Sequence, residues 1–298
     1  MILVTGATGF VGSRLLNRLA ASQGAEPLRG SARHVDKRDL PVGVEGVPAD
    51  VTKPETLPAA LEDVTTLVHA AAITANLKEP FPGAYREINE TGTYNLMKAA
   101  EEAGVSRVVL MSGLSAPAKE GSYMATRLGM EKAVRDSGIP SVILQPSVLF
   151  GDDAEFVAAL ARLARFSPVL PLMGDPKLKF QPLWIEDLLR ILEQSIRSEE
   201  HLGQAIPIGG PEQVTFKEVL QTICEAMSVR RLLLPLPFPF IRIQARAMAA
   251  LLPKPPLTPA TLELFQFDNS TSLDAVPTNF GFQPRGFREH LLAHGVNG

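Results

Sequence analysis

A tyrosine and an arginine stand four residues apart in the stretch SYMATRLGMEK at 122–132. If this stretch is a helix, the phenol of Tyr123 and the guanidinium of Arg127 lie on the same side, one turn apart. A cation beside a phenol favours the phenolate, which suits a side chain that gives and takes a proton during catalysis. An ordinary surface pair is the alternative, so the surrounding elements have to decide between the two.

A glycine-rich segment, TGATGFVGSR, follows the first apolar strand and opens a helical pattern. Small residues at such a junction let the backbone approach a pyrophosphate, which then lies at the N-terminus of the helix. The sequence therefore predicts a dinucleotide site at this loop and the first helical turn. Its candidate residues are Gly6, Thr8, Gly9, Phe10, Val11 and Gly12.

The residues after the second predicted strand favour NADP(H) over NAD(H). An NAD site usually has an acid about 20 residues beyond the glycines, which binds the ribose hydroxyls. Here the region reads LRGSARH, with no carboxylate before Asp36, and it offers Arg33. A guanidinium suits a 2′-phosphate, and Arg14 beside the glycine loop is a second candidate. Two ordinary solvated charges are the alternative.

Three further segments, ADVTKPETL, VHAAAI and REINETGTYNL, supply candidate cofactor contacts. Asp50 and Val51 are placed to read an adenine edge, with a helix-capping turn as the alternative. Asn89 lies in a helical pattern, where a lone asparagine usually faces solvent. The small residues of the second segment lie where a flat cofactor must pass: Ala70, Ala71 and Ala72.

Length, charge and cysteine content narrow the class of protein. The 298 residues suffice for one large α/β domain or two modest ones, and 29 basic against 32 acidic residues disfavour nucleic-acid binding. The single cysteine, Cys224, lies in an apolar helical pattern, so we expect a packing role and no metal site. The chain starts directly on a strand and has no apolar run of about 18 residues, so we expect a cytoplasmic protein.

Apolar strands alternate with helical patterns through the first half of the chain. Strands are predicted at 1–5, 26–33, 44–48, 65–71, 107–112 and 140–145, and helices at 9–22, 54–62, 84–103 and from Tyr123. This alternation predicts an α/β fold with a Rossmann-type, doubly wound parallel sheet. We expect a dinucleotide-binding domain at 1–150, a returning segment at about 179–209, and a smaller C-terminal substrate lobe at 151–178 and 210–298.

The second half has weaker patterns. A helix is predicted at 215–227 with Thr215 as its N-cap, and another at 240–252 with Arg242 and Arg246 on one face. A neighbouring apolar stripe of that last helix either packs on its own lobe or docks on a partner or membrane surface: Ile241, Ala245, Met248 and Leu252. Other apolar residues line a substrate pocket or form the core of the lobe: Phe150, Phe156, Phe166, Leu170, Leu172 and Met173.

Together these motifs resemble the short-chain dehydrogenase/reductase superfamily in its extended or atypical branch. The resemblance rests on TGATGFVG, ADV, VHAAA, the N-x-x-G-T-x-N-L pattern at 89–96, the Tyr123 helix and QPSVLFG at 145–151. The later segments KFQPLWIEDLLR, GGPEQVTFKEVL and PLTPATLELFQFDNST are similar to bacterial relatives of the NAD(P)H-binding accessory subunit of respiratory complex I.

The resemblance assigns roles to the opening pair. The superfamily motif is Tyr-x-x-x-Lys, so Tyr123 takes the acid/base position and Arg127 the position of the lysine that holds the nicotinamide ribose. Arginine keeps the charge but not the compact ammonium geometry. The third member is a serine or threonine at the end of the fifth strand. Gly113 stands near that place here, and either Ser112 or Ser115 beside it could supply the hydroxyl; Ser112 is our catalytic candidate.

By the same resemblance, Pro146 and Ser147 lie near the nicotinamide, and Gln145 replaces the usual arginine before that proline. The chain is therefore expected to be an NADP(H)-dependent oxidoreductase acting on a small or lipophilic carbonyl or quinone-type compound. One alternative is a non-catalytic NADPH-binding module that docks, through 232–252, on a membrane-associated respiratory or quinone enzyme at the inner face of the membrane. A nucleotide-sugar epimerase or dehydratase ranks third, because that class usually keeps the lysine and prefers NAD.

Overall fold

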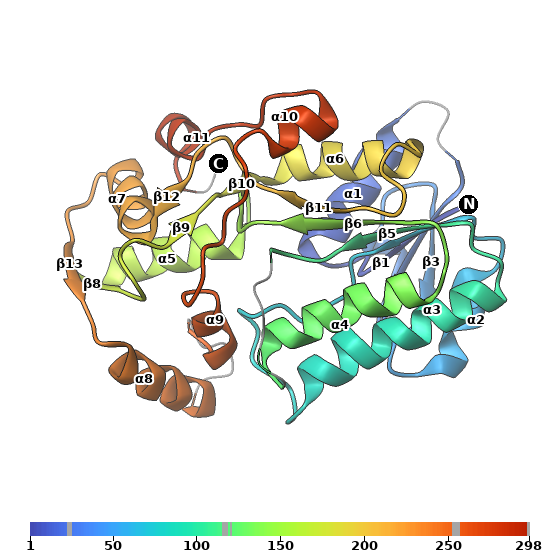
Figure 1. Ribbon diagram of the computed structural model, residues 1–298, viewed down its shortest axis with the longest axis horizontal. Helices are drawn as coiled ribbons and strands as arrows, with labels where there is room; N and C mark the ends of the chain where they lie inside the picture. The colour runs from blue at the N-terminus through green and yellow to red at the C-terminus, as the bar shows by residue number, and fades with distance from the viewer. Residues whose placement is uncertain (23–25, 115–118, 120, 252–256, 297–298) are drawn as a thin grey trace. The chain divides into compact units, whose positions relative to one another are not determined.

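The computed structural model describes residues 1–22, 26–114, 119, 121–251 and 257–296 (Figure 1). The chain divides into two compact units. Unit 1 consists of Met1–Ile73, Glu79–Gln145 and Leu189–Ile206, and unit 2 consists of Thr74–Lys78, Pro146–Leu188 and Pro207–Gly298. The chain thus leaves unit 1 after Ile73 and after Gln145, and it returns at Glu79 and at Leu189.

The centre of unit 1 is a seven-stranded sheet in the order β11-β6-β5-β4-β1-β2-β3. Its strands are β1 Ile2–Thr5, β2 Leu28–Ala32, β3 Val44–Pro48, β4 Thr66–His69, β5 Arg107–Met111, β6 Ser141–Pro146 and β11 Ala205–Ile208. All neighbouring pairs from β6 to β3 are parallel. The predicted fold class is confirmed. The strand order reverses at β1, and ligands of such sheets bind at the carboxyl ends beside this reversal.

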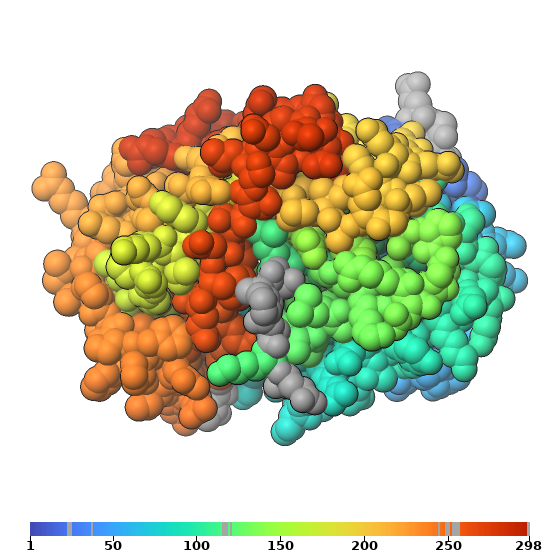
Figure 2. All heavy atoms as spheres, in the orientation of Figure 1, coloured from blue at the N-terminus to red at the C-terminus, as the bar shows by residue number. Residues whose placement is uncertain are grey.

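Helices cover both faces of this sheet (Figure 1). α1 Phe10–Ala21 and α6 Ile185–Arg197 lie on one face, and α2 Leu57–Leu61, α3 Gly92–Glu102 and α4 Tyr123–Asp136 lie on the other. α3 and α4 lie side by side, as Figure 2 also shows (cyan and green). Apolar residues of α2, α3 and α4 pack against β1, β4 and β5 in one buried cluster, which fixes the helices over the sheet.

Local signals explain where these elements start. The side chain of Ser122 accepts a hydrogen bond from the Ala125 backbone N–H and so caps α4. The helix predicted at 84–103 begins instead as a π-helix, Arg86–Thr91, before it continues as α3. Two 3₁₀ turns, at Lys37–Asp39 and Pro54–Thr56, complete unit 1.

Unit 2 is built from short strand pairs and helices. Its strands are β7 Leu149–Phe150, β8 Val169–Leu172, β9 Lys179–Phe180, β10 Leu183–Trp184, β12 Val214–Thr215 and β13 Leu232–Pro235. They form the two-stranded pairs β10-β7, β12-β9 and β13-β8. Its helices are α5 Glu155–Phe166, α7 Phe216–Ala226, α8 Phe238–Leu251, α9 Pro259–Glu263, α10 Ala275–Phe280 and α11 Phe287–His294. The predicted N-cap of α7 is confirmed, since Thr215 and Glu218 form a capping box.

The apolar residues expected to line a substrate pocket mostly form the core of unit 2. Phe150 and Leu170 are fully buried, Met173 is nearly so, and Phe156 stacks on Phe180. Leu172 packs against the same cluster. The expectation for Phe166 is wrong: it stands at the end of α5 with 83% of its surface exposed. Burial also raises the pKa of the Cys224 thiol, in keeping with its predicted packing role.

The predicted helix at 240–252 is confirmed as α8. Ile241 and Ala245 are buried in unit 2, whereas Arg242 and Arg246 are exposed. The side chain of Met248 and the whole of Leu252 lie outside the described residues. Among the helices that the structure describes, none is both long and apolar enough to cross a bilayer.

Candidate cofactor site and active site

A cavity of about 520 Å³ lies in unit 1, at the carboxyl ends of β1, β2, β3 and β4. This volume is typical of ligand pockets, and the position is the one that the strand reversal at β1 predicts. Residues from all four strand ends line it, including Gly6, Thr8, Gly9, Arg33, His34, Asp50, Val51, Ala70, Ala71 and Ala72. Apart from His34, these are residues that the sequence singled out as candidate cofactor contacts.

The three glycines of the first loop serve different purposes. Gly6 has φ +70°, and a Cβ there would lie 3.0 Å from the backbone of Ala70, so the turn requires glycine. A Cβ on Gly12 would lie 2.2 Å from the Gly6 carbonyl oxygen, so the helix can pack on the loop only without a side chain. Gly9 lines the cavity as bare backbone, and a Cβ there would already lie 3.1 Å from the same oxygen.

The N-terminus of α1 fits the phosphates of a dinucleotide. α1 begins at Phe10 and has no side-chain cap, so the N–H groups of its first turn, on Phe10, Val11 and Gly12, are donors available to an anion. Bare backbone at Gly9 leaves room for a pyrophosphate in front of them. The side chain of Arg14 instead lies over the Phe10 ring, with its guanidinium carbon 4.5 Å from the ring centroid.

The end of β2 is basic. Arg33 and His34 line the cavity, and both are exposed. The nearest acid downstream, Asp36, accepts hydrogen bonds from the Arg38 backbone N–H at 3.0 Å and from its guanidinium at 2.9 Å. These bonds hold the pKa of the Asp36 carboxyl below its usual value and cap the following 3₁₀ turn. The carboxylate that would bind ribose hydroxyls is therefore absent from this strand end as the structure describes it.

Asp50 at the end of β3 both caps a turn and lines the cavity. Its Oδ1 accepts hydrogen bonds from the Thr52 backbone N–H at 3.0 Å and from the Thr52 hydroxyl at 2.8 Å. The capping turn considered from the sequence is thus formed. Val51 is held in place by Asn95, whose side-chain amide donates to the Val51 carbonyl at 3.0 Å.

A fully buried histidine joins β1, β4 and α3. His69 Nδ1 lies 2.8 Å from the Thr5 hydroxyl, and Nε2 lies 3.0 Å from the Thr93 hydroxyl. The Thr93 hydroxyl donates to the backbone carbonyl of Asn89, so its oxygen must accept from Nε2–H. Nδ1 therefore accepts from Thr5. Nothing in the sequence singled out His69 beyond its place in VHAAA.

This hydrogen-bonded chain ends at the cavity wall. The Thr5 oxygen accepts the backbone N–H groups of Ala70 and Ala71, at 3.2 and 3.3 Å. Burial lowers the pKa of His69 to about 4, and the positive charge of Arg127 acts in the same direction. At neutral pH the imidazole is therefore neutral, as its two hydrogen bonds require.

Asn89 is a buried clamp. It lies in the π-helix, fully buried, so the expectation that a lone helical asparagine faces solvent is wrong. Its side chain accepts from the Ile73 N–H at 2.8 Å, donates to the Ile73 carbonyl at 3.0 Å, and donates to the Thr126 hydroxyl at 3.3 Å. It thus links the segment after β4 to the first turns of α4.

The opening pair is buried on α4. Tyr123 has 7% of its surface exposed, and its ring meets that of Tyr85 edge to face at 5.2 Å. The Arg127 guanidinium donates from Nη2 to the Ser112 carbonyl at 2.7 Å, and its Nη1 lies 3.6 Å from the Met130 sulfur. Among the described residues, no carboxylate forms an ion pair with Arg127. A buried cation that pairs with no carboxylate in the described part of the chain therefore lies one turn from a buried phenol.

The hydroxyl of Ser112 points to a carboxylate that the sequence analysis missed. Ser112 donates to Glu131 Oε1 at 2.8 Å, and the Gln145 amide donates to the same oxygen at 2.8 Å. Arg135 binds the other oxygen at 3.0 Å. The sequence did contain a signal for Glu131, because four-residue spacing on α4 places it in one row with Tyr123, Arg127 and Arg135. Ser115 lies outside the described residues.

The predicted contacts after β6 lie in unit 2. Pro146 is the last residue of β6, and Ser147 is buried with its hydroxyl 2.8 Å from Asn269 Oδ1 and 2.9 Å from the Asn269 carbonyl oxygen. Ser147 thus has a bonding partner within its own unit. Trp184 in unit 2 is half-buried, and the guanidinium carbon of Arg285 lies 4.2 Å from the centroid of its ring.

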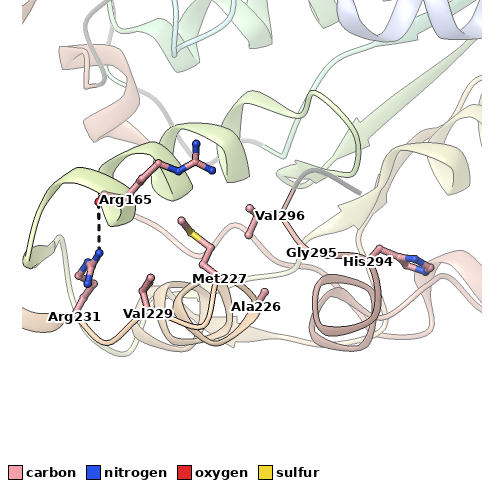
Figure 3. A pocket seen from close by; sticks show the side chains of 8 residues that line it. All are labelled: Arg165, Ala226, Met227, Val229, Arg231, His294, Gly295 and Val296. Carbon is pink, nitrogen blue, oxygen red and sulfur yellow. Dashed lines mark hydrogen bonds between the residues drawn. The ribbon is translucent and has the colours of Figure 1, made fainter.

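Unit 2 also has a hollow of about 390 Å³ (Figure 3). It is lined by Arg165, Ala226, Met227, Val229, Arg231, His294, Gly295 and Val296. The Arg231 guanidinium donates to the carbonyls of Ala164 at 2.6 Å and Arg165 at 3.5 Å, which satisfies the C-terminal end of α5. Arg231 therefore stabilises a helix end.

Comparison with known proteins agrees with this geometry. Residues 6–166 match the model of an NAD(P)H-binding family. The chain is 26% identical to subunit 9 of the NADH dehydrogenase (ubiquinone) 1 alpha subcomplex of Arabidopsis thaliana, over 91% of this chain and 68% of that protein. It is also 26% identical to an NAD(P)H azoreductase of Xenophilus azovorans, over 99% and 98%.

Among solved structures, a UDP-glucose 4-epimerase of Thermus thermophilus in complex with NAD has a TM-score of 0.74 at 21% identity, with 99% of this chain and 98% of that chain covered. That likeness shows the fold. The family match covers more than half of the chain and includes the three glycines of the first loop, most residues that line the cavity, and the Tyr123 helix. The chain therefore belongs to the NAD(P)H-binding family, in the extended, epimerase-like branch of the short-chain dehydrogenases/reductases.

Proposed function

We propose that the protein is an NADP(H)-dependent oxidoreductase that reduces a small or lipophilic carbonyl or quinone-type compound. The observation that carries this proposal is the pairing on α4 of buried Tyr123 with buried Arg127, a cation that has no carboxylate partner among the described residues. Azoreductase and ceramide reductase relatives support a reductive reaction.

In this proposal a bound nicotinamide supplies the hydride. Tyr123 gives its phenol proton to the substrate oxygen, and the charge of Arg127 stabilises the phenolate that remains. The Ser112 carbonyl fixes the guanidinium, and Glu131 fixes Ser112 by accepting a hydrogen bond from its hydroxyl. Ser112 therefore acts as a support for Arg127 and does not itself contact the substrate.

The other half of the cofactor is assigned to the cavity of unit 1. The first turn of α1 holds the pyrophosphate, Asp50 and Val51 contact the adenine, and the three alanines after β4 form the flat wall. Arg33 and His34 bind the 2′-phosphate. This arrangement favours NADPH over NADH.

Titration of the intact protein with both cofactors, followed by nicotinamide fluorescence, tests this part. NADPH is expected to bind more tightly, and Arg33→Ala is expected to weaken NADPH binding roughly tenfold or more while NADH binding stays the same. Arg38→Ala is the matched control, because Arg38 lies on the same loop but pairs with Asp36 outside the cavity. Equal affinity for the two cofactors would refute the preference.

Turnover is tested by following NADPH oxidation in the presence of menadione and a panel of aldehydes and ketones. Oxidation that depends on Tyr123 is expected with at least one of them. A protein that binds NADPH but oxidises it with none of these compounds would speak for the second candidate.

That second candidate is a non-catalytic NADPH-binding module. It is favoured by the Ser112 hydroxyl, which is committed to Glu131, and by arginine in place of the lysine of the superfamily. The plant relative that carries the name of a NADH dehydrogenase subunit is in keeping with a structural role. An epimerase is less well supported, because β2 ends without an acid for the ribose of NAD.

A further inference from the structure

Two consecutive elements of unit 2 expose large apolar side chains. On α8, Phe240 is 70% exposed, Ile243 is 67% exposed and Leu251 is 80% exposed. On β13, which directly precedes α8, Leu232 and Leu234 are exposed as well. We call these five residues the β13–α8 face; Figure 2 shows α8 in orange on the outer surface.

The geometry of α8 separates this face from the side that packs in the core. At about 100° per residue, Phe240, Ile243 and Leu251 fall within an arc of roughly 80°. Ile241 and Ala245 lie outside that arc and are buried in the cluster around Phe180 and Phe216. α8 is thus apolar on one side that is packed and on a second side that is open, which is unusual for a helix facing only water.

The charged residues that the structure describes on β13 and α8 are both basic. Arg242 and Arg246 are exposed and lie on the flank of α8 between the open and the packed side. The sequence has no acidic residue between Glu225 and Glu263, whereas it has basic residues at 230, 231, 242, 246 and 254. An apolar arc with an arginine flank and no acid complements a surface that is both apolar and anionic.

We propose that the β13–α8 face docks on an anionic phospholipid bilayer. Phe240 and Ile243 enter the boundary between headgroups and acyl chains, while Arg242 and Arg246 reach the phosphate groups. The long arginine side chains can bind phosphates while their stems cover apolar surface. This inference is independent of the proposed reaction, since neither Tyr123 nor the cavity of unit 1 takes part in it.

The test is flotation of the purified full-length chain with lipid vesicles. We expect binding to vesicles of phosphatidylcholine mixed with phosphatidylglycerol, weakened by salt, and little binding to phosphatidylcholine alone. Each basic residue near an anionic surface strengthens binding about fivefold, so Arg242→Glu together with Arg246→Glu is expected to weaken it roughly 25-fold or more. Phe240→Ser together with Ile243→Ser is expected to abolish the binding that persists at high salt.

Matched controls distinguish binding through the β13–α8 face from non-specific binding to the vesicles. Lys177→Glu with Lys217→Glu makes the same charge change on other exposed residues of unit 2, and Leu292→Ser removes a leucine that is 42% exposed on α11. Both controls are expected to bind like the unchanged protein. All variants are also checked for NADPH affinity and thermal unfolding, which should be unaltered because the substituted side chains are exposed.

Three results would overturn the proposal. The first is no binding of the unchanged protein to phosphatidylglycerol vesicles at low salt. The second is equal loss in the controls and in the variants of the β13–α8 face. The third is a dimer in analytical ultracentrifugation that Phe240→Ser with Ile243→Ser converts to a monomer without changing lipid binding, which would assign the face to a second copy of the chain.

Discussion

Two buried arginines of unit 1 lie in contrasting surroundings. Arg29 on β2 is 5% exposed and pairs with Glu45 at 2.8 Å, while its Nη1 donates to the carbonyls of Ala60 at 3.0 Å and Glu62 at 2.6 Å at the end of α2. Arg127 on α4 is 6% exposed but has one carbonyl, a methionine sulfur and, in the described part of the chain, no carboxylate.

The difference in partners distinguishes a structural arginine, Arg29, from Arg127, whose charge can act on a bound ligand. Arg29 is neutralised by a carboxylate and satisfies two orphan carbonyls of a helix end, so its charge is fully used by the fold. Arg107 is similar: it binds the Ile196 carbonyl at the end of α6 and pairs with Glu199. An uncompensated buried charge such as Arg127 costs stability, and such a cost is commonly found at functional sites.

The largest expected effect is on stability. Arg29→Met leaves the Ala60 and Glu62 carbonyls without their donor and removes the ion pair, so we expect a loss of about 3 kcal/mol in the free energy of unfolding. Arg127→Met replaces a buried cation that has no carboxylate partner among the described residues by an apolar side chain of similar length, and we expect a change within about 1 kcal/mol. Urea unfolding followed by circular dichroism measures both, and equal losses would make Arg127 as structural as Arg29.

The next effect concerns turnover. Tyr123→Phe removes the proposed proton donor but keeps the ring that packs edge to face on Tyr85, so we expect a loss of roughly a hundredfold in kcat with NADPH affinity unchanged. Tyr94→Phe is the control, because Tyr94 is 60% exposed on α3. Full activity of Tyr123→Phe would refute the proposed role of Tyr123, and with it the proposal that Arg127 stabilises its phenolate.

A smaller effect is expected from changing the cation itself. Arg127→Lys keeps a positive charge at the position where the superfamily has lysine, so turnover should stay within about tenfold of the unchanged protein. Arg127→Ala removes the charge and should lower kcat and weaken NADPH binding, each by roughly tenfold. Steady-state kinetics and cofactor titration measure the two. If alanine and lysine behaved alike, the charge would have no role.

Sequence patterns predicted the part of the molecule whose signals are local. The alternation of strands and helices, the glycine loop at 5–14 and the cap at Thr215 depend on neighbours in the chain, and the fold class is confirmed. Arg29 could not be interpreted in this way, because its partners Ala60 and Glu62 lie more than thirty residues away. The role of Arg29 depends on which elements lie beside β2, and the periodicity of apolar residues in the sequence does not predict the order of strands in the sheet.

The candidate site shows the same limit. The residues that line the cavity come from strand ends, so their gathering follows from the parallel sheet. Asn89 was misread because it lies in a π-helix and faces inward. Glu131 on α4 was missed because its partners are distant in the chain: Ser112 follows β5, and Gln145 lies on β6. Phe166 was misplaced because apolar character alone does not say which side of α5 is covered.

The smallest expected effect is the influence of the Arg127 charge on the stability of the protein at acid pH, which acts through His69. In the folded protein the pKa of His69 is lowered to about 4 by burial and by the cation of Arg127, whereas it is about 6.5 in the unfolded chain. Between these values the unfolded state binds the extra proton, so stability is complete above about pH 6.5 and falls, by on the order of 3 kcal/mol, as the pH drops towards 4. Arg127→Met removes the repulsion but not the burial, so it should reduce this acid-dependent loss by only on the order of 0.5 kcal/mol.

Arg29→Met should leave the loss unchanged, since Arg29 is not among the causes of the shift. Urea unfolding of the three proteins at about pH 7 and about pH 4.5 measures these differences. The same acid-dependent loss in all three would show that the charge of Arg127 is compensated after all, and that the two arginines differ less than their partners indicate.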